Sequence, residues 1–542
     1  MASVDNTSAV PRSDRLGQLS LLVFGPTLVL LLGSAVVTWL QHAIETIHYP
    51  YQLSYGEGVV WQQAAMILRG EGYAPLEDDP HVVFHYPPVF HLASGLTSLI
   101  TGDLLSGARV ASGFSALLCL VAIAGTLHGV AQRGCADARP VWTISLLVGF
   151  VAGALFLTSP AVATWGQFGR VDTMAFAAGL CAMWAGLNAL DRPRNAWLLI
   201  AFVALSLYSK HSALALPTAL FSMLLLADTR RALGIMLRCL ALGLIVLAVL
   251  MIYSEGRFLT HIIGYNINRM DPARLQLGLR IITTERYILL CGVPTAIYIA
   301  YRLLGQSLPS GLSGLSATLR ASLAARFDLF LILYLILGSL KLLLIAKVGS
   351  DTNYAFDFIA ALSLLTGRGL LLLLAPGALA TRRPVLFAVA ALTLILDATR
   401  LPVLDRQPTP AEDALYALIQ STDAPLISDE MVMLRRSGKE LFYEPAIFAE
   451  LEAMGVWDSA PVIDRIERGE FPFAIARYYG DFEERKEWFP ASVRAALEAH
   501  FPVLRRFGAY IVYMPAGSAP AGSEPLDPRT GRPFVASGSE TP

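Results

Sequence analysis

Long apolar segments alternate with short polar connections from residue 19 to residue 401. Most are roughly 17–25 residues long, the length that a helix needs to cross the hydrocarbon core of a bilayer. About eleven such segments lie near residues 19–40, 106–130, 141–159, 172–190, 195–209, 212–227, 235–254, 283–302, 327–347, 353–374 and 384–401. The pattern predicts a polytopic α-helical membrane protein with about eleven transmembrane helices. The first segment lacks a small-residue cleavage site, so we expect a retained anchor rather than a signal peptide.

A shorter apolar segment, residues 89–100, follows Pro87-Pro88, and its length suits an interfacial or re-entrant helix better than a span. The positive-inside rule decides between the two, because short cytoplasmic loops carry an excess of Lys and Arg. If the segment does not cross and the N-terminus is cytoplasmic, the arginines of the short loops all lie on the cytoplasmic side: Arg12, Arg15, Arg133, Arg139, Arg192, Arg194, Arg230, Arg231, Arg302, Arg320, Arg326, Arg382 and Arg383. A crossing segment would turn every loop after it outward. We therefore expect residues 89–100 not to cross.

The same topology places most unusual polar residues of the membrane half on the outer face. They lie in the long first loop at 41–105, the turns at 166–172, 208–212 and 347–357, and the loop at 255–282. Long loops beside a membrane are often functional. We predict that residues 1–404 form a transmembrane domain whose outer end carries a site, with interfacial helices in the first loop.

The composition changes after residue 401, where charged and amphipathic sequence begins. Residues 424–430 and 508–515 have the pattern of strands, and the sequence between them has helical periodicity in AIFAELEAMGV and ASVRAALEAHF. We predict a small α/β domain at 405–515 on the outer side. Residues 516–542 are rich in Pro, Gly and Ser, and we predict that they are disordered.

The overall composition agrees with a membrane protein, since 55% of the residues are hydrophobic and only 15% are charged, against about 25% charged in soluble domains. The net charge of −1 says nothing about nucleic acid, but no Lys/Arg-rich run appears, so we expect no nucleic acid as a partner. The five cysteines lie in or beside apolar segments, without the spacing of a metal motif.

The first outer loop contains YGEGVVW, in which two glycines flank Glu57. The glycines permit a close approach by a ligand, and a carboxylate at a membrane surface can take a proton from a substrate hydroxyl. A solvated acid at the start of an interfacial helix is the alternative. In HYPP (85–88), the residue before a proline is held out of the helical region, so His85 and Tyr86 can face a cavity or simply precede a helix.

Two turns on the outer side combine charges with helix ends. GRVD places Arg170 and Asp172 at the start of a span, where an ionisable pair is either functional or a mutually neutralising cap. Lys210 and His211 lie between two short apolar segments. A lysine there can hold a phosphate as a point charge or extend to the interface.

Basic residues also gather in the outer loop at 255–286, against the charge rule. They are Arg257, Arg269, Arg274, Arg280 and Arg286, together with Tyr265, Asn266 and Asn268. Such residues suit anionic lipid or lipid-phosphate groups, or they are solvated at the rim. GSDTNYAFDF (349–358) brings Asp351, Asn353, Tyr354 and Asp357 to the head of a span, where they can bind sugar hydroxyls or cap the helix. Lys341 lies inside an apolar segment and needs a partner that the sequence does not identify.

Together, these segments resemble the GT-C superfamily of polyprenyl-phosphate-sugar-dependent glycosyltransferases. More narrowly, they are similar to the protein O-mannosyltransferases and lipid A aminoarabinose transferases of glycosyltransferase family 39. The resemblance is carried by YGEGVVWQQAAMILRGEGYAP, HYPPVFHLASGLTSLITG, ARVASGF, SPAVATWGQFGRVDTMAF and YSKHSALALP, within about residues 40–220. The alternation of spans extends the likeness to about residue 400.

The resemblance implies an inverting membrane glycosyltransferase that moves a sugar from a polyprenyl-phosphate donor to a hydroxyl of a glycan, lipid or protein. It would act at the outer face of the inner or plasma membrane, with a cytoplasmic N-terminus and an extracytoplasmic C-terminal domain. The family has an acidic pair where this chain has Gly56-Glu57, so Glu57 is the expected base and Asp172 matches a second acid. The expected substrate-binding residues are Tyr55, His85, Tyr86, Arg109, Arg170, Lys210, His211, Arg269, Asp351, Asn353 and Tyr354, with Lys210 at the donor phosphate.

The sequence has no convincing DxD motif, so we expect no obligatory cofactor or metal, although a divalent ion is not excluded. Two other classes of function remain open. A transporter or flippase for lipid-linked saccharides would more often show inverted repeats and midplane charges. A non-catalytic assembly factor would use its outer domain to bind glycan.

Overall fold

The computed structural model describes residues 12–134, 139–266, 268–307, 311–375, 383–399, 407–477 and 488–526. Within these ranges, eleven helices coincide with the eleven predicted apolar segments. They are α1 (Arg12–His48), α4 (Leu104–Gly134), α5 (Arg139–Thr158), α7 (Val171–Leu187), α8 (Pro193–Ser209), α9 (Ala215–Ala227), α10 (Thr229–Tyr253), α13 (Arg286–Ser307), α15 (Leu323–Leu342), α16 (Phe356–Leu374) and α17 (Arg383–Ala398). Six helices in the described part are long and apolar enough to cross a membrane, and further apolar helices are shorter. The chain is therefore a multi-pass integral membrane protein.

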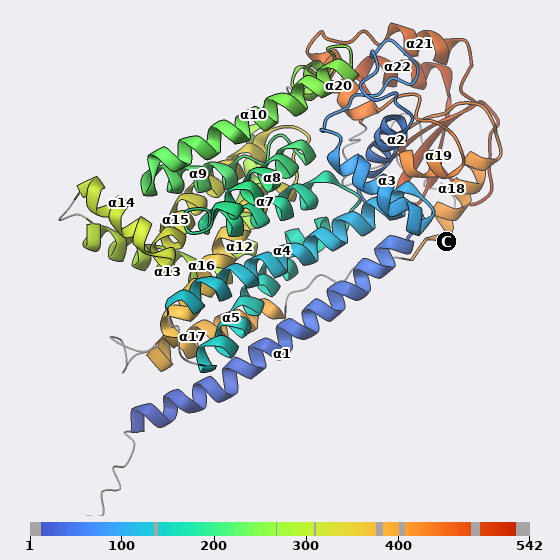
Figure 1. Cartoon of the computed structure of the whole chain (residues 1–542). Helices are drawn as coiled ribbons and strands as arrows, with labels where there is room; N and C mark the ends of the chain where they lie inside the picture. Colours follow the sequence, from blue (N-terminus) through green and yellow to red (C-terminus); the bar gives the residue numbers. More distant parts are fainter. Residues whose placement is uncertain are drawn as a thin grey trace, which may run out of the picture.

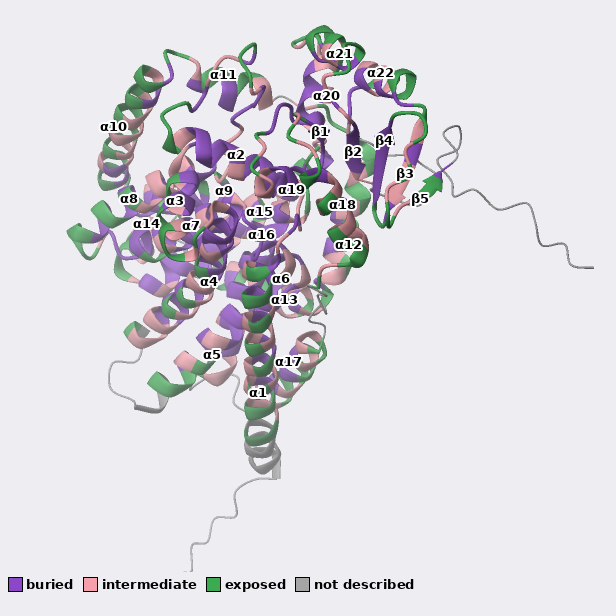
Figure 2. Ribbon diagram, turned by 90° about the vertical axis from the view of Figure 1, so that its right-hand side faces the viewer, coloured by how far each residue is buried: buried purple, intermediate pink, exposed green. Residues whose placement is uncertain are grey.

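The helices form one elongated bundle with the C-terminal domain at one end (Figure 1). Large apolar side chains are exposed along the outward faces of the peripheral helices, as at Leu30 on α1 and Ile252 on α10. Figure 2 shows the complementary pattern, with buried residues inside the bundle and exposed ones along α1, α10 and α17. In water such surfaces would be unfavourable, whereas lipid tails are as apolar as the side chains themselves.

At the end of the bundle that lies away from the C-terminal domain, one carboxylate forms ion pairs with two arginines and so links the ends of three helices. Asp191, after α7, accepts from Arg133 of α4 at 2.7 Å and from Arg326 of α15 at 2.5 Å. These helix ends therefore lie together, as the predicted topology requires. Which end faces the cytoplasm stays a prediction, and Arg382 lies outside the described residues.

The first loop holds two short helices, α2 (Gly56–Leu68) and α3 (Val89–Thr101). Both lie at the end of the bundle beside the C-terminal domain and neither runs along its length (Figure 1). The helix α3 ends at Gly102, whose φ of 87° is favourable only for a residue without a side chain. The prediction that residues 89–100 do not cross agrees with this arrangement.

Shorter helices complete the connections. They are α6 (Pro160–Trp165), α11 (Phe258–Ile262), α12 (Leu275–Thr284) and α14 (Gly311–Ala321), with 3₁₀ turns η1 (Gly264–Asn266), η2 (Pro272–Arg274), η4 (Leu343–Ala346) and η5 (Thr352–Ala355). The turns η1, η2 and η5 belong to the predicted outer loops.

The C-terminal domain is a small α/β domain, as predicted. Its elements are α18 (Pro410–Gln420), β1 (Ile427–Ser428), α19 (Met431–Arg436), α20 (Pro445–Ala453), α21 (Ala460–Glu467), β2 (Ala474–Arg477), α22 (Ala491–His500), β3 (Val503–Phe507), β4 (Tyr510–Met514) and β5 (Glu524–Leu526). The sheet has the order β1-β2-β4-β3-β5. Only the β1–β2 pairing is parallel among the described strands.

The boundary predicted for the disordered tail needs correction. Strand β5 pairs with β3, with Leu526 opposite Leu504, and Leu526 is buried. Apolar burial and strand pairing hold this segment despite its Pro/Gly/Ser-rich composition. The rest of the predicted tail, residues 527–542, lies outside the described residues.

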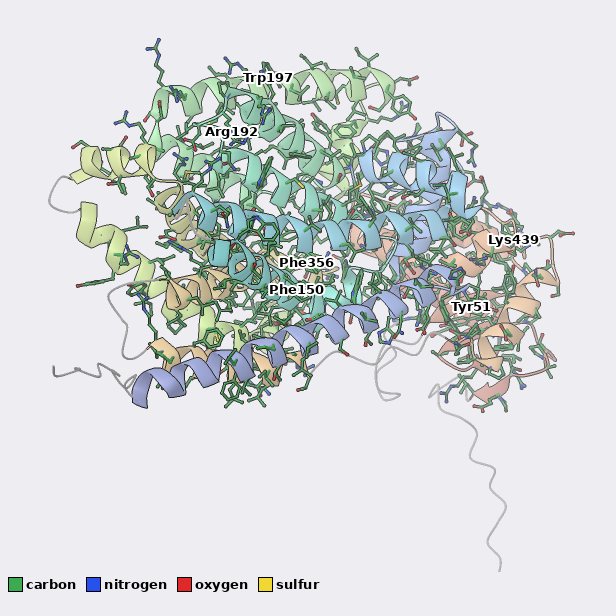
Figure 3. The ribbon with its side chains drawn as sticks, turned by 60° about the horizontal axis from the view of Figure 1, so that its bottom comes forward. Tyr51, Phe150, Arg192, Trp197, Phe356 and Lys439 are labelled. Atoms are coloured by element: carbon green, nitrogen blue, oxygen red, sulfur yellow. The ribbon has the colours of Figure 1, made fainter. Side chains whose placement is uncertain are left out.

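The C-terminal domain docks on the chain between α1 and α2. The hydroxyls of Tyr49 and Tyr51 donate to Glu412 and Asp413 of α18, at 2.9 and 2.5 Å. Gln52 donates to the Asp429 carbonyl at 3.1 Å. Figure 3 shows Tyr51 at the domain, while Phe150 and Phe356 lie within the bundle. Several polar contacts therefore fix the domain against the membrane part.

The closest approach between the two parts is at Gly58 of α2. A Cβ built on Gly58 would lie 2.9 Å from the Met431 carbonyl carbon and 3.0 Å from the Val432 amide nitrogen, both in α19. Backbone atoms cannot rotate away as a side chain does, so this glycine allows α2 and α19 to pack directly against each other.

Candidate active site

A cavity of about 570 Å³ lies between the end of the bundle and the C-terminal domain. This volume is within the range of small-molecule sites. Ten predicted site residues line it: Tyr55, His85, Tyr86, Arg170, Lys210, His211, Arg269, Asp351, Asn353 and Tyr354. Loops that are far apart in sequence therefore converge here. The remaining three predicted residues, Glu57, Arg109 and Asp172, do not line this cavity.

Glu57 lies behind the cavity wall and is fully buried. Arg109, near the start of α4, donates to both of its carboxylate oxygens at 2.9 Å. The amides of Gly169 and Leu53 donate to the same carboxylate at 2.9 and 2.8 Å. Burial alone would raise the pKa of Glu57, but Arg109 and the amide donors lower it below the ordinary value.

This environment argues against the role expected for Glu57, which stays a prediction. A general base needs a free lone pair within reach of the substrate proton, whereas both oxygens of Glu57 already accept hydrogen bonds inside the protein. Arg109 is equally occupied, since it also donates to the carbonyls of Thr46, Tyr49 and Tyr51. The pair holds α4, the end of α1 and the first loop together, and neither residue lines the cavity.

The neighbouring Gly56 leaves space for a cation. A Cβ built on Gly56 would overlap Nη1 and Cζ of Arg170. The Arg170 guanidinium also donates to the Tyr86 hydroxyl at 3.2 Å and lies 5.6 Å from the centre of the Trp165 ring. The cavity therefore has a positive group where a side chain at position 56 would stand.

Asp172 lies beneath the cavity, next to a smaller void of about 20 Å³. It accepts from the Lys210 ammonium, from the Asn353 amide at 2.7 Å and from the Trp165 indole at 3.1 Å. Asp172 thus positions three side chains of the cavity wall. Lys210 is neutralised by this pairing and lies 5.1 Å from the centre of the Tyr354 ring.

The smaller void also borders the buried charge whose partner the sequence does not identify. Lys341 donates to Asp357 at 2.5 Å, and the Tyr334 hydroxyl donates to the same carboxylate at 3.0 Å. An intramembrane lysine is expected to have such a partner. Asp357 is therefore a partner for Lys341 rather than a sugar-binding residue.

Two other cations of the cavity lack a carboxylate partner among the described residues. Lys347 donates to the carbonyl and side-chain oxygens of Asn266, at 2.7 and 3.1 Å. Arg274 donates to the carbonyls of Ile345 and Ser350. Arg269 differs from them, because it forms an ion pair with Glu450 at 2.9 Å. Lys347 and Arg274 retain positive charge that an anionic ligand can neutralise.

The two cavity histidines are uncharged near neutral pH. Burial, with the nearby Arg170 and Lys347, lowers the pKa of His85 to about 3. Burial, with Lys210 and Lys347, lowers the pKa of His211 to about 4. Both rings can therefore donate or accept a hydrogen bond without adding charge to the cavity.

Three further lining residues are of chemical interest: Arg274, which the sequence singles out only as one of the basic loop residues, and Lys347 and Glu444, which sequence reasoning did not select. Lys347 begins the polar turn 347–357, and Arg274 belongs to the basic loop, so the sequence contains a signal for both. Glu444 has none, because it precedes Pro445 in a soluble domain whose contact with the bundle is visible only in three dimensions.

No group of three or more His, Cys, Asp or Glu side chains suited to a metal ion occurs among the described residues. The predicted independence from metal stays a prediction.

Among solved structures, the chain is similar to ArnT from Cupriavidus metallidurans, in the apo state and bound to undecaprenyl phosphate. Identity is 14% in both cases, with TM-scores of 0.56 and 0.58, over 89% of this chain and 97% of ArnT. The chain has the fold of ArnT. The Archaeoglobus fulgidus oligosaccharyltransferase, in complex with Zn and sulfate, is also similar, with 12% identity and a TM-score of 0.46 over 90% of this chain and 74% of that one.

No protein-family model matches the sequence, and no curated protein does. The predicted architecture, a helical membrane bundle with a small C-terminal α/β domain, is confirmed as an ArnT-like fold. In this ArnT-like fold the cavity lies where the bundle meets the C-terminal domain.

Proposed function

We propose that the protein is a membrane glycosyltransferase that takes a sugar from a polyprenyl-phosphate-linked donor and attaches it to an acceptor hydroxyl. The observation that carries the proposal is the cavity beside the membrane part, with Lys347 and Arg274 as cations lacking carboxylate partners among the described residues. A lipid-linked donor needs such a place, because its tail lies in the bilayer while its phosphate and sugar are polar.

The charge distribution suits the leaving group. The donor phosphodiester carries one negative charge, and the polyprenyl phosphate that departs carries a second one at neutral pH. Preorganised cations stabilise charge that develops in a transition state. We assign this role to Lys347 and Arg274, assisted by Lys210, whose ammonium Asp172 holds in place.

Three further points support the proposal. The fold is that of ArnT, which was solved with undecaprenyl phosphate bound. Uncharged His85 and His211 and the amide of Asn353 offer hydrogen bonds to sugar hydroxyls. Loop arginines gather at the end of the bundle away from the cavity, and under the positive-inside rule this supports an outer-face position for the cavity. The reaction would invert the anomeric carbon, since the acceptor attacks opposite the phosphate.

The direct test is incubation of the purified protein in lipid nanodiscs with a panel of polyprenyl-phosphate sugars and candidate acceptors. We expect one donor to release polyprenyl phosphate, detected by mass spectrometry, together with a glycosylated acceptor. Movement of intact donor across proteoliposomes, without release of polyprenyl phosphate, would instead identify a flippase.

The donor-phosphate assignment predicts the effect of Lys347→Met. Hydrogen bonds to charged groups contribute about 1.5–3 kcal/mol, so we expect kcat/KM for the donor to fall about 10- to 100-fold, mainly through kcat because the charge develops in the transition state. Lys439→Met is the control, because Lys439 donates to the Thr422 carbonyl in the C-terminal domain and does not line this cavity. Equal kcat/KM for the donor in the two variants would contradict the assignment.

A further inference from the structure

Glu444 stands in the part of the cavity wall that comes from the C-terminal domain. It precedes α20 in an extended conformation, with φ −100° and ψ 106°. The residue is only 5% exposed, yet it lines the cavity. Its Oε2 atom is buried and has no hydrogen-bond partner among the described residues. A buried carboxylate oxygen without a partner is unfavourable and is often explained by a functional role.

The other carboxylates at the cavity already accept hydrogen bonds from groups of the protein. Glu450 accepts from Arg269 through both oxygens, at 2.9 and 3.2 Å. Asp351 caps η5 by accepting from the Thr352 amide at 2.6 Å and is exposed. Asp172 lies beneath the floor and is held by Lys210 and Asn353. Among the described lining residues, Glu444 is therefore the buried carboxylate with an oxygen that has no hydrogen-bond partner.

Its surroundings place it close to the chemistry. Arg170, whose guanidinium occupies the space beside Gly56, acts electrostatically on Glu444. The bundle side of the same cavity carries Lys347 and Arg274. A ligand in this cavity would have cations of the membrane part on one side and the Glu444 carboxylate on the other.

We propose that Glu444 is the catalytic base that takes the proton of the acceptor hydroxyl. The proposal rests on the glycosyl transfer proposed above. The acceptor oxygen forms a bond to the anomeric carbon while its proton moves to the Glu444 carboxylate. The bond between the anomeric carbon and the phosphate oxygen breaks, and its electron pair leaves with the polyprenyl phosphate. The C-terminal domain thereby supplies a group that the membrane part of the cavity lacks.

The environment of Glu444 determines how the rate depends on pH. Burial raises the pKa of Glu444 to about 8, although Arg170 and the Ile447 amide oppose this shift. Tyr443, beside it in the chain, is coupled electrostatically to Glu444, and the titratable side chains of His85, Tyr86 and Glu450 line the same cavity. The base acts only when ionised, so kcat/KM should fall about tenfold per pH unit below this pKa and reach a plateau above it.

The test compares wild-type protein with Glu444→Gln, Glu444→Asp and the control Glu467→Gln, whose exposed side chain lies on α21. General-base catalysis contributes about 10²- to 10⁴-fold. We expect Glu444→Gln to lose at least 100-fold in kcat, with unchanged binding of undecaprenyl phosphate as evidence that it is folded. The fall of kcat/KM below the pKa of Glu444 should be absent from the pH profile of this variant. Glu444→Asp should retain part of the rate, and Glu467→Gln all of it.

The outcomes separate this proposal from the one on which it rests. If the wild-type protein transfers sugar and Glu444→Gln does so at a rate within threefold of it, the role of Glu444 is overturned. The proposed glycosyltransferase function then still stands. A slow Glu444→Gln that keeps the wild-type pH profile would also overturn it, because the titrating group would then lie elsewhere. Absence of transfer by the wild-type protein from every donor would end both proposals.

Discussion

Arg109→Met is expected to lower the free energy of unfolding by about 3–5 kcal/mol. Removing one partner of a buried ion pair leaves the other charge uncompensated, and the loss is of this size. Both side chains of the Arg109–Glu57 pair are fully buried, and Arg109 also satisfies the carbonyls of Thr46, Tyr49 and Tyr51. Thermal or denaturant unfolding in detergent measures the change.

Glu57→Gln should also lower the free energy of unfolding. The double variant with Arg109→Met and Glu57→Gln should lose less stability than the sum of the two single losses. Arg69→Met is the matched control, since Arg69 pairs with Glu71 and Glu440 while its side chain is 42% exposed. Exposed pairs contribute about 0–1 kcal/mol. A Glu57→Gln protein with wild-type stability but no transfer would show that the carboxylate takes part in the chemistry after all.

Gly58→Ala is expected to reduce sugar transfer about 10- to 100-fold by moving the C-terminal domain away from the bundle. Alanine in a helix is favoured over glycine by about 1 kcal/mol, so propensity alone would stabilise α2. Overpacking costs about 1–3 kcal/mol, and the new Cβ would meet backbone atoms of Met431 and Val432. The clash is therefore expected to dominate. A misplacement of about 1 Å can lower a rate by about 10²-fold.

Faster hydrogen exchange in α19 should accompany the loss of transfer, because the docking contact loosens. Gly113→Ala is the control, since Gly113 lies in α4 with open space around it. Full transfer by Gly58→Ala would mean that the docked position of the domain is unimportant for the reaction.

The helices and their order along the bundle could be predicted because their signals are local. A run of apolar residues specifies a span through its own length, and loop arginines specify which connections share an end. The convergence of Lys210, Asp351 and Asn353 on one cavity follows from the same reasoning, since the connections that carry them lie at the same end of the bundle. Topology alone brings these residues together.

The roles of individual charges could not be predicted, because they depend on partners far away in the sequence. Glu57 and Arg109 are 52 positions apart, and nothing in YGEGVVW indicates that the carboxylate points into the protein. Asp172 is held by Asn353 across 181 positions. Glu444 enters the cavity only because its domain docks on the first loop. Only three-dimensional packing distinguishes an engaged carboxylate from a free one.

The contact between Gly56 and Arg170 makes these two positions a single unit of sequence change. Any side chain at position 56 would claim the volume that the guanidinium fills. An acid could therefore appear at position 56 only together with a shorter or displaced side chain at position 170. Relatives of this chain should accordingly carry either glycine with arginine or a larger residue with a smaller partner, and the two positions should covary. If position 56 is compared alone, an acid is lost in this chain. If positions 56 and 170 are compared together, a negative side chain at one position is exchanged for a positive side chain from the other.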